Sequence, residues 1–252
     1  MGKVKLSIII PNYNEKENLD RGVLDEVAAY LKKVSYSWEV IINEDSSTDG
    51  SGEIIARFVK KHPGFKMIKG AHAGKAAGIW NGMRAAKGEI VLFTDMDQST
   101  PLKEVEKLLP YYEAGYDVVF GSRGKMRENF PLTRQLMSWG FRHFRQLFLL
   151  PKVIDTQCGF KSFRRGVAME IFPRLEVIKH QGVVKGWSVS AFDVELLFIA
   201  QKWDYRLQEV EVEWRDRDIS LGKQKNFMTE STDMLKQILR VTVNNLTGRY
   251  QK

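Results

Sequence analysis

Two carboxylates in the sequence, Asp95 and Asp97, stand where a metal-dependent reaction could use them. They lie in EIVLFTDMDQSTP (89–101), directly after a run of β-forming residues, and one residue separates them. Mg²⁺ and Mn²⁺ prefer hard oxygen ligands, commonly one or two carboxylates together with substrate phosphates. One acid could hold the metal ion while the other orients a sugar or ribose hydroxyl. The alternative is helix capping, because a helix can open at Pro101 and Asp is common just before helices.

A second acidic stretch, NEDSSTDG (43–50), also follows a strand-like run. A carboxylate here, at Glu44 or Asp45, could accept a hydrogen bond from the imide N–H of uracil or from a guanine edge. The alternative is an ordinary strand-to-helix turn with Thr48 or Asp49 as the cap.

A third stretch, AGKAAG (73–78), resembles a phosphate-binding loop around Lys75. It lacks the Gly-x-x-x-x-Gly-Lys-Ser/Thr spacing, so it is not a P-loop. Small residues at this position are equally explained by a helix that packs closely on a sheet.

These stretches need elements that bring them together, and the chain alternates strand and helix patterns. Strands are expected at 5–10 (ending at Pro11), 38–42, 65–68, 89–94 and 117–120, with helices at 17–33, 48–61, 75–86 and 103–113. Further along we expect helices at 133–150, at 190–202 and from about 227, a turn-rich segment at 155–165 and a strand at 206–214. Strands separated by helices favour an α/β fold with a mostly parallel sheet covered on both faces. Ligands of such sheets bind beyond the carboxyl ends of the strands, which is where the acidic stretches fall.

Length and composition set the remaining bounds. The chain has 252 residues, of which 43% are hydrophobic and 28% charged, so we expect one globular domain (1–214) followed by a basic loop and a C-terminal helix (215–252). That helix could pack on the domain or on a membrane surface. The single cysteine, Cys158, favours a reducing compartment, and no apolar run is long enough to cross a bilayer. We therefore expect a cytoplasmic protein, peripheral at the membrane, that does not span it.

The net charge of +8 suits a polyanionic partner, which could be nucleic acid, anionic lipid or a phosphorylated substrate. A non-catalytic polyanion-binding module remains an alternative from another class. It would need no paired acids at the end of a strand, and nucleic acid is for that reason not the expected partner.

Several motifs together, in order and spacing, resemble glycosyltransferase family 2. They are IIIPNYNEKENL (8–19), INEDSSTDGS (42–51), GKAAGIWNGMRAAKGEIVLFTDMDQSTP (74–101), VVFGSR (118–123) and DTQCGFKSFRR (155–165). The resemblance is greatest to the branch that makes polyprenyl-phosphate sugars, and DTQCGFK with FDVELLFIA (192–200) points within it to dolichyl-phosphate β-glucosyltransferases. It implies a GT-A fold.

The same resemblance implies roles for individual residues. It places Pro11, Tyr13, Glu15, Asp45, Lys75 and Asp95 at the nucleotide sugar. Asp95 and Asp97 match the Asp-x-Asp motif of the family, with Asp97 the more direct ligand of Mg²⁺ or Mn²⁺. Arg123 and Arg134, together with Ser138, match positions near the acceptor phosphate, so the expected catalytic group is Asp95, Asp97, Arg123 and Arg134.

Two other groups have open interpretations. Arg217, Lys223 and Lys225 could close over the donor diphosphate or could form a solvated loop. The acids Asp193 and Glu195 could contact sugar hydroxyls or fix a loop, or could be surface acids of a helix. The helix expected at 133–150, rich in Arg, Trp, Phe and Leu, suits a membrane interface but also an ordinary domain helix.

The implied reaction is metal-dependent transfer of glucose from UDP-glucose to a polyprenyl phosphate of the dolichyl type, with inversion to a β-linked product. An anionic phosphate acceptor needs little help from a general base. GDP-mannose as the donor, or another acceptor, is the alternative within the family. Mannosyl relatives often carry Gln two places after the second acid, where this chain has Ser99.

Overall fold

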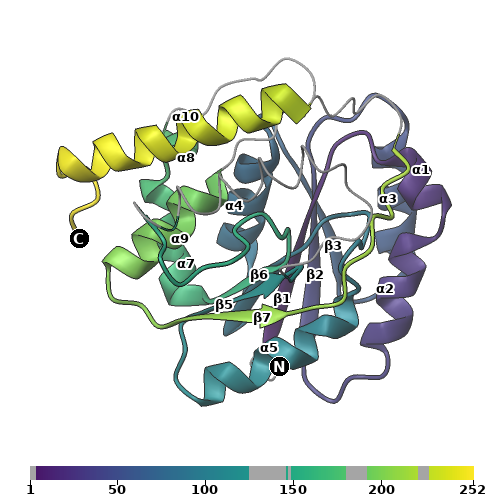
Figure 1. Ribbon diagram of the computed structural model, residues 1–252. Coiled ribbons are helices and arrows are strands. Elements are labelled where there is room, and N and C mark those ends of the chain that lie inside the picture. Colours follow the sequence, from purple (N-terminus) through teal and green to yellow (C-terminus); the bar gives the residue numbers. More distant parts are fainter. Residues whose placement is uncertain (1–3, 125–145, 147–148, 180–191, 221–226) are drawn as a thin grey trace.

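Seven strands form a single sheet in this computed structural model, which describes residues 4–124, 146, 149–179, 192–220 and 227–252 (Figure 1). The strand order is β3-β2-β1-β4-β6-β5-β7. The strands are β1 (Leu6–Asn12), β2 (Trp38–Glu44), β3 (Phe65–Lys69), β4 (Ile90–Phe93), β5 (Val118–Ser122), β6 (Lys161–Arg164) and β7 (Leu207–Glu211). Only β6 runs antiparallel to its neighbours β4 and β5, so the predicted mostly parallel α/β sheet is confirmed.

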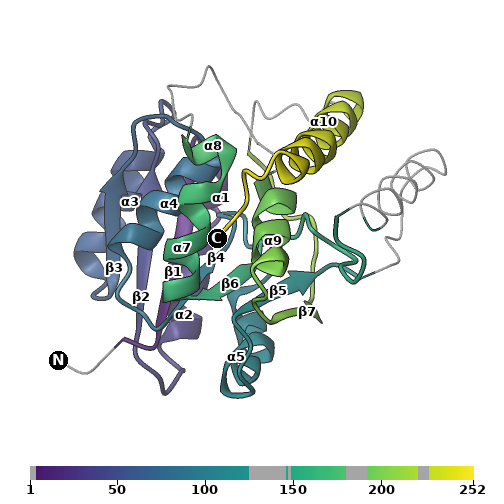
Figure 2. The same cartoon turned by 90° about the vertical axis from the view of Figure 1, so that its left-hand side faces the viewer.

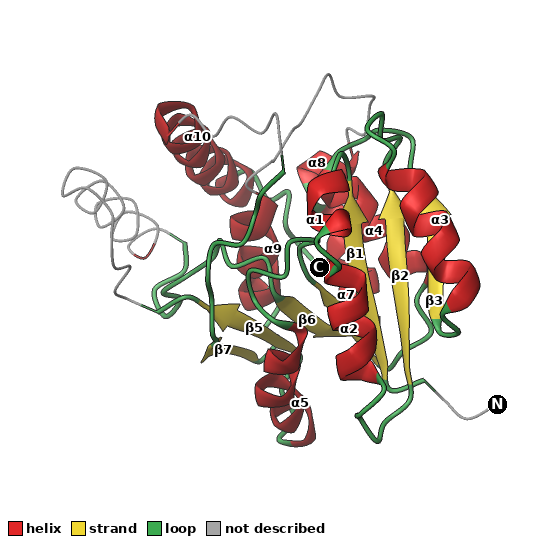
Figure 3. Ribbon diagram, turned by 90° about the vertical axis from the view of Figure 1, so that its right-hand side faces the viewer, coloured by secondary structure: helices red, strands yellow, loops and turns green. Residues whose placement is uncertain are grey.

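Helices cover both faces of this sheet. They are α1 (Lys16–Asp20), α2 (Val23–Leu31), α3 (Ser51–Lys61), α4 (Lys75–Ala85), α5 (Val105–Glu113), α7 (Arg165–Ile171), α8 (Glu176–Lys179), α9 (Phe192–Lys202) and α10 (Phe227–Leu246), with 3₁₀ turns at Leu102–Glu104 and Phe172–Arg174. The sheet twists strongly, so that β5 and β7 lie across the direction of β1 and β2 (Figure 3). Helix α3 lies at the β3 end of the sheet and α9 lies near β5 (Figure 2).

The hydrophobic core has two layers because side chains alternate between the faces of each strand. Ile9 and Phe93 face α4, where they meet Ile79, and this layer continues into α7, α9 and α10. Ile8 and Leu92 face the opposite way and pack with residues of α2 and α5. Strands with both faces buried explain the uninterrupted apolar runs in the sequence.

Two predicted boundaries were wrong for reasons of backbone geometry. The expected helix at 17–33 is two helices, because Gly22 adopts φ 83°, a left-handed conformation that glycine tolerates at little cost. The first strand continues through Pro11 to Asn12. The backbone N–H and C=O of Ile9 point towards β4, whose last paired residue is Phe93. Pro11, two residues further on, points to the same side, where β4 has already ended, so no strand hydrogen bond is lost through its missing N–H.

Strand β6 was missed entirely, since its segment was predicted to be turn-rich. It carries Lys161 and Ser162, both fully buried, and polar residues do not indicate a central strand. Their partners come from distant parts of the chain: Ser162 Oγ donates to Val119 O (2.7 Å) and accepts from the Tyr112 hydroxyl (2.7 Å).

Two of the helices predicted in the second half of the chain are present. The helices expected at 190–202 and from about 227 are confirmed as α9 and α10. Nearly all of the helix expected at 133–150 lies outside the described residues. The division at residue 214 stays a prediction. In the parts of the chain described here, no helix combines the length and the apolar character needed to cross a bilayer.

Candidate functional site

The loops after β1 and β2 are joined side by side at the carboxyl edge of the sheet. The Ser47 hydroxyl accepts from Asn12 Nδ2 and from the Asn14 backbone N–H, both at 3.1 Å. In return, Asn14 Oδ1 accepts from the Thr48 N–H at 2.9 Å. Tyr13 lies between these two asparagines, so its position is set by both loops.

Asp45 links these loops to the third one. Its carboxylate accepts hydrogen bonds from the backbone N–H groups of Gly74 (2.9 Å) and Ala73 (3.3 Å), and its side chain is 7% exposed. Gly74 directly precedes α4, so this carboxylate caps the amino end of that helix, where negative charge is stabilising. A carboxylate has about four acceptor positions, so two remain for a ligand.

An aromatic pair lies next to this carboxylate. The rings of Tyr13 and His72 are 4.4 Å apart between centroids, and His72 Nδ1 lies 3.2 Å from the backbone oxygen of Asp45. The ring planes are tilted by 36°, so the two rings do not form one flat surface, but a single aromatic face beside an acceptor of hydrogen bonds suits a nucleobase. His72 was missed as a site residue, although its place in the loop after β3 was a signal for it.

The acids of the Asp-x-Asp stretch follow β4, and Lys75 lies with them. Lys75 Nζ is 2.5 Å from Asp95 Oδ1. Burial by itself would lower the pKa of Lys75, but Asp95, Asp193 and Asp97 outweigh it and the pKa is raised. Burial and the neighbouring charge of Asp95 raise the pKa of Asp97. Carboxylates that repel each other in a partly buried place favour a bound cation.

The turn that carries these acids is held from several sides. Asp97 Oδ1 accepts from the Ser99 N–H (2.8 Å), while the Asp97 carbonyl accepts from Arg21 Nη2 (2.7 Å). Gly159 packs directly behind Asp95, since a Cβ at residue 159 would lie 2.1 Å from Asp95 Oδ2. The Asp97 carboxylate closes this turn and does not cap a helix, because the next helical turn begins at Leu102 and has no side-chain cap bond, while Asp95 is directed at Lys75.

The basic segment after β7 crosses this turn. The backbone N–H groups of Arg215 and Arg217 donate to Ser99 O (2.9 Å) and Ser99 Oγ (3.2 Å). The Arg217 guanidinium makes two bonds to Glu26, at 2.8 and 2.9 Å, and these lower the pKa of Glu26. Arg217 is thus close to the acids, but its side chain is engaged elsewhere. Lys223 and Lys225 lie outside the described residues.

Arg123 follows β5 and forms a two-pronged ion pair. Its Nε and Nη2 donate to the two carboxylate oxygens of Asp155 at 2.7 and 2.8 Å, and its guanidinium lies 5.6 Å from the centre of the Trp214 ring. Nη1 remains for a ligand, so contact with an acceptor phosphate stays a prediction. Arg134 and Ser138, predicted to lie beside it, fall in the part of the chain that the structure does not describe.

A buried ion pair joins β6 to α9. Lys161, fully buried, lies 2.7 Å from Asp193, whose side chain is 14% exposed. Glu195 lies in the core, where it accepts from the Tyr250 hydroxyl (2.7 Å) and the Glu176 N–H (3.2 Å). The interpretation of Glu195 as a surface acid was therefore wrong. Sequence analysis had no signal for Lys161, because its partner is far away in the chain.

The remaining predicted residues lie at the same edge. Pro11, the last residue but one of β1, lies beside Gly78 of α4, and Glu15 accepts from Asn18 Nδ2 at 2.7 Å. Among the residues described, no three His, Cys, Asp or Glu side chains converge on a metal position.

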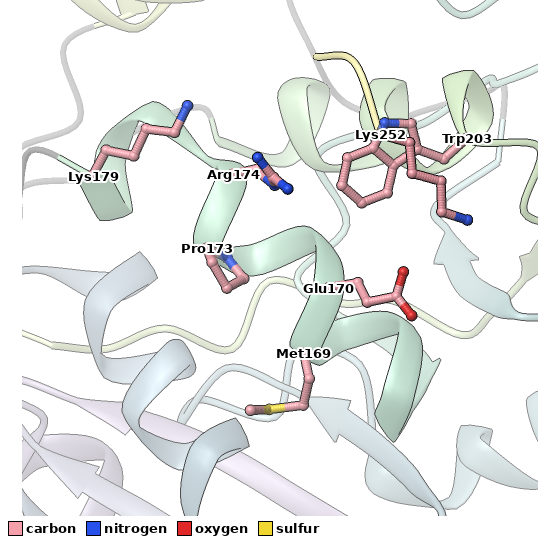
Figure 4. A pocket seen from close by; sticks show the side chains of 7 residues that line it. All are labelled: Met169, Glu170, Pro173, Arg174, Lys179, Trp203 and Lys252. Atoms are coloured by element: carbon pink, nitrogen blue, oxygen red, sulfur yellow. The ribbon is translucent and has the colours of Figure 1, made fainter. Parts of the chain in front are cut away.

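A shallow hollow of about 430 Å³ lies elsewhere and shares none of the predicted site residues (Figure 4). It is lined by Met169, Glu170, Pro173, Arg174, Lys179, Trp203 and Lys252.

Comparison with known proteins extends the resemblance found in the sequence. A family model described as "Glycosyl transferase family 2" matches residues 7–172. A dolichyl-phosphate beta-glucosyltransferase from Dictyostelium discoideum is 30% identical over 262 residues, covering 97% of this chain and 76% of that protein. One from Homo sapiens is 31% identical over 268 residues, covering 98% of this chain and 78% of that protein.

A solved structure supports the fold. Glucosyl-3-phosphoglycerate synthase from Mycobacterium tuberculosis, in complex with Mn²⁺, UDP and glucosyl-3-phosphoglycerate, aligns with a TM-score of 0.62 at 16% identity. The alignment covers 98% of this chain and 80% of that one. At this identity the likeness concerns the fold alone, and it agrees with the GT-A architecture expected from the sequence.

Proposed function

This chain belongs to glycosyltransferase family 2, and we propose that it transfers glucose from UDP-glucose to a polyprenyl phosphate of the dolichyl type, giving a β-linked product. The observation that carries the proposal is the meeting of Asp95, Asp97 and Lys75 with the loop of Asp45 at one edge of the sheet. The choice of glucose and of a dolichyl acceptor rests on relatives of that name, which match nearly the whole chain.

The nucleoside would bind against the first three loops. One ring of the Tyr13–His72 pair would stack on the base, and the Asp45 carboxylate would accept from the imide N–H of uracil. Guanine also offers N–H donors, so this contact by itself does not separate UDP from GDP.

The residues present fit Mg²⁺ or Mn²⁺. Asp95 and Asp97 are hard oxygen donors, and the raised pKa of Asp97 reflects burial next to a like charge that a cation would relieve. The protein provides two carboxylates here, which leaves positions for oxygens of the donor diphosphate. A bound ion would stabilise the negative charge that develops on the departing UDP.

The reaction is a single displacement. An oxygen of the acceptor phosphate forms a bond to the anomeric carbon, while the bond from that carbon to the diphosphate oxygen breaks and UDP leaves with its electron pair. Inversion converts an α-linked donor into a β-linked product. No general base is required, because a polyprenyl phosphate is ionised at neutral pH.

The enzyme's own contribution is then to hold two anions close together. Lys75 brings a positive charge to the donor side, beside Asp95. Arg123 and Arg134 would hold the acceptor phosphate, since a guanidinium offers a fixed set of donors to phosphate oxygens. Because that acceptor is a lipid, we expect the enzyme to work at the cytoplasmic surface of the membrane that carries it.

A matrix of donors and acceptors tests the proposal. UDP-glucose, UDP-N-acetylglucosamine and GDP-mannose would each be supplied with polyprenyl phosphate and Mg²⁺ or Mn²⁺, and lipid-linked sugar would be extracted and counted. We expect product chiefly from UDP-glucose. Product from GDP-mannose alone would identify a mannosyltransferase, and transfer only to water-soluble acceptors would contradict a lipid substrate.

A further inference from the structure

Helix α10 presents two different faces. Ile238 and Val241 are fully buried in the layer of the core that α9 shares. A second apolar set is exposed on the same helix: Leu235 (39%), Leu239 (49%), Val243 (56%) and Leu246 (80%). Their spacing of four, four and three residues places them in one stripe, roughly opposite the buried face at 100° per residue. The stripe therefore faces away from the protein.

This stripe is part of a wider pattern. Among the residues that the structure describes, the exposed large hydrophobic side chains are these four and Ile219. The Ile219 N–H donates to Asn18 of α1, which follows β1, so Ile219 also lies at the carboxyl edge of the sheet. In Figure 3 the arrowheads of β1 and β2 point towards the end of the molecule where α10 lies. Helix α10 and Ile219 thus both lie at the end of the molecule to which the strands that carry the candidate site point.

The charges of opposite sign lie in different parts of α10: Glu230 and Asp233 in its first two turns, and Lys236 and Arg240 after them. Lys236 and Arg240, both exposed, stand one turn apart beside the stripe. From Met234 to Lys252 the sequence has four basic residues, Lys236, Arg240, Arg249 and Lys252, and no Asp or Glu. A helix with an aliphatic stripe flanked by Lys and Arg is typical of segments that lie in the headgroup region of anionic membranes.

We propose that the stripe of Leu235, Leu239, Val243 and Leu246, with Lys236 and Arg240, seats the enzyme on an anionic lipid surface. This rests on the proposed function, because a membrane-borne acceptor would then meet the site at the end of the molecule where it opens. A second copy of the chain fits less well, because four side chains are few for a stable protein interface of about 1,000 Å² or more.

Vesicle cosedimentation of the full chain, without donor or acceptor, tests the inference separately from catalysis. The vesicles would be phosphatidylcholine alone and phosphatidylcholine mixed with phosphatidylserine. We expect binding to the mixed vesicles that weakens with salt, and Leu239→Gln/Val243→Gln should reduce it by at least about tenfold. Leu239→Met, which keeps the stripe apolar, should bind like the wild type.

Two double variants of equal net charge distinguish vesicle binding through the α10 stripe from binding that depends on net charge alone. Lys236→Gln/Arg240→Gln and Lys32→Gln/Lys33→Gln each lower the net charge from +8 to +6 (8 − 2). Lys32 and Lys33 are exposed just after α2, at the opposite edge of the sheet. Binding should fall by about fivefold for each basic residue removed from α10, and it should change little in the second pair.

Several outcomes would overturn the inference: no binding to either kind of vesicle, equal losses in the two charge pairs, or unchanged binding of Leu239→Gln/Val243→Gln. Dimers in solution that these α10 changes dissociate would show that a second copy covers the stripe. Transfer to polyprenyl phosphate dispersed in detergent could still succeed in each case. Conversely, vesicle binding with no transfer would contradict the proposed function and leave the inference standing.

Discussion

Replacement of Asp45 by alanine should weaken both the fold and the binding of UDP. The carboxylate is almost completely buried and accepts from the N–H groups of Gly74 (2.9 Å) and Ala73 (3.3 Å) at the start of α4. A hydrogen bond to a charged group contributes about 1.5–3 kcal/mol, and loss of a helix cap costs about 0.5–2 kcal/mol. The longer of the two bonds is weak, so we expect a loss of about 2–3 kcal/mol in the free energy of unfolding.

Thermal unfolding and calorimetric titration with UDP would measure the two effects in the same samples. For a chain of this size, a loss of about 2–3 kcal/mol lowers Tm by about 4–12 °C. Asp49→Ala is the matched control. Asp49 also accepts from two backbone N–H groups, those of Lys16 and Ser51 (both 2.9 Å), in the same loop. It should cost similar stability but much less UDP affinity.

Two results would refute this reasoning about Asp45. An unchanged Tm would mean that its contacts with the α4 loop contribute nothing to stability. A lower Tm with unchanged UDP affinity would leave Asp45 a structural residue only, and the proposed contact with the base would be wrong.

Three further changes have distinct expected results. Asp97→Asn should nearly abolish transfer at unchanged Tm, because it removes a proposed metal ligand; near-normal turnover in the folded variant would exclude that role. Arg123→Lys should lower acceptor efficiency by about ten- to a hundredfold and leave UDP affinity almost unchanged, since Lys cannot pair with Asp155 through two nitrogens and still offer a third to a phosphate. If UDP affinity falls instead, Arg123 serves the donor. Burial raises the pKa of Glu195 above the ordinary value of a glutamate, 4.5, so the stability it contributes is lost as pH rises through that raised pKa. The free energy of unfolding of the wild type relative to Glu195→Gln should therefore be greater near pH 4.5 than at neutral pH, and a difference that does not vary with pH would contradict the shift.

The sequence predicted those features that depend on local pattern. Apolar runs followed by polar loops indicated the parallel strands, and the rule that ligands bind at the carboxyl ends brought Asp45, Lys75 and Asp95 to one edge. The small residues of the AGKAAG stretch explain close packing as well, since Gly78 meets Pro11 and Asn43 of the sheet.

Features that depend on partners far apart in the chain could not be predicted. Strand β6 looked like turns because Lys161 is polar, and its burial is made possible by the Asp193 carboxylate and the Cys158 carbonyl oxygen beside its ammonium. The bonds of Arg123 to Asp155 and of Arg217 to Glu26 are likewise long-range. They matter for function, because an arginine that is already paired must share or change its partner to hold a phosphate.

The most direct measurement is the structure of the product itself. The wild type and Asp97→Asn would be incubated with UDP-glucose, polyprenyl phosphate and Mg²⁺ or Mn²⁺, and the lipid fraction would be analysed by NMR for its anomeric configuration. The account predicts a β-linked glucosyl phosphate lipid from the wild type and almost none from the variant. An α-linked product, or no glucose in the lipid fraction of the wild type, would contradict it.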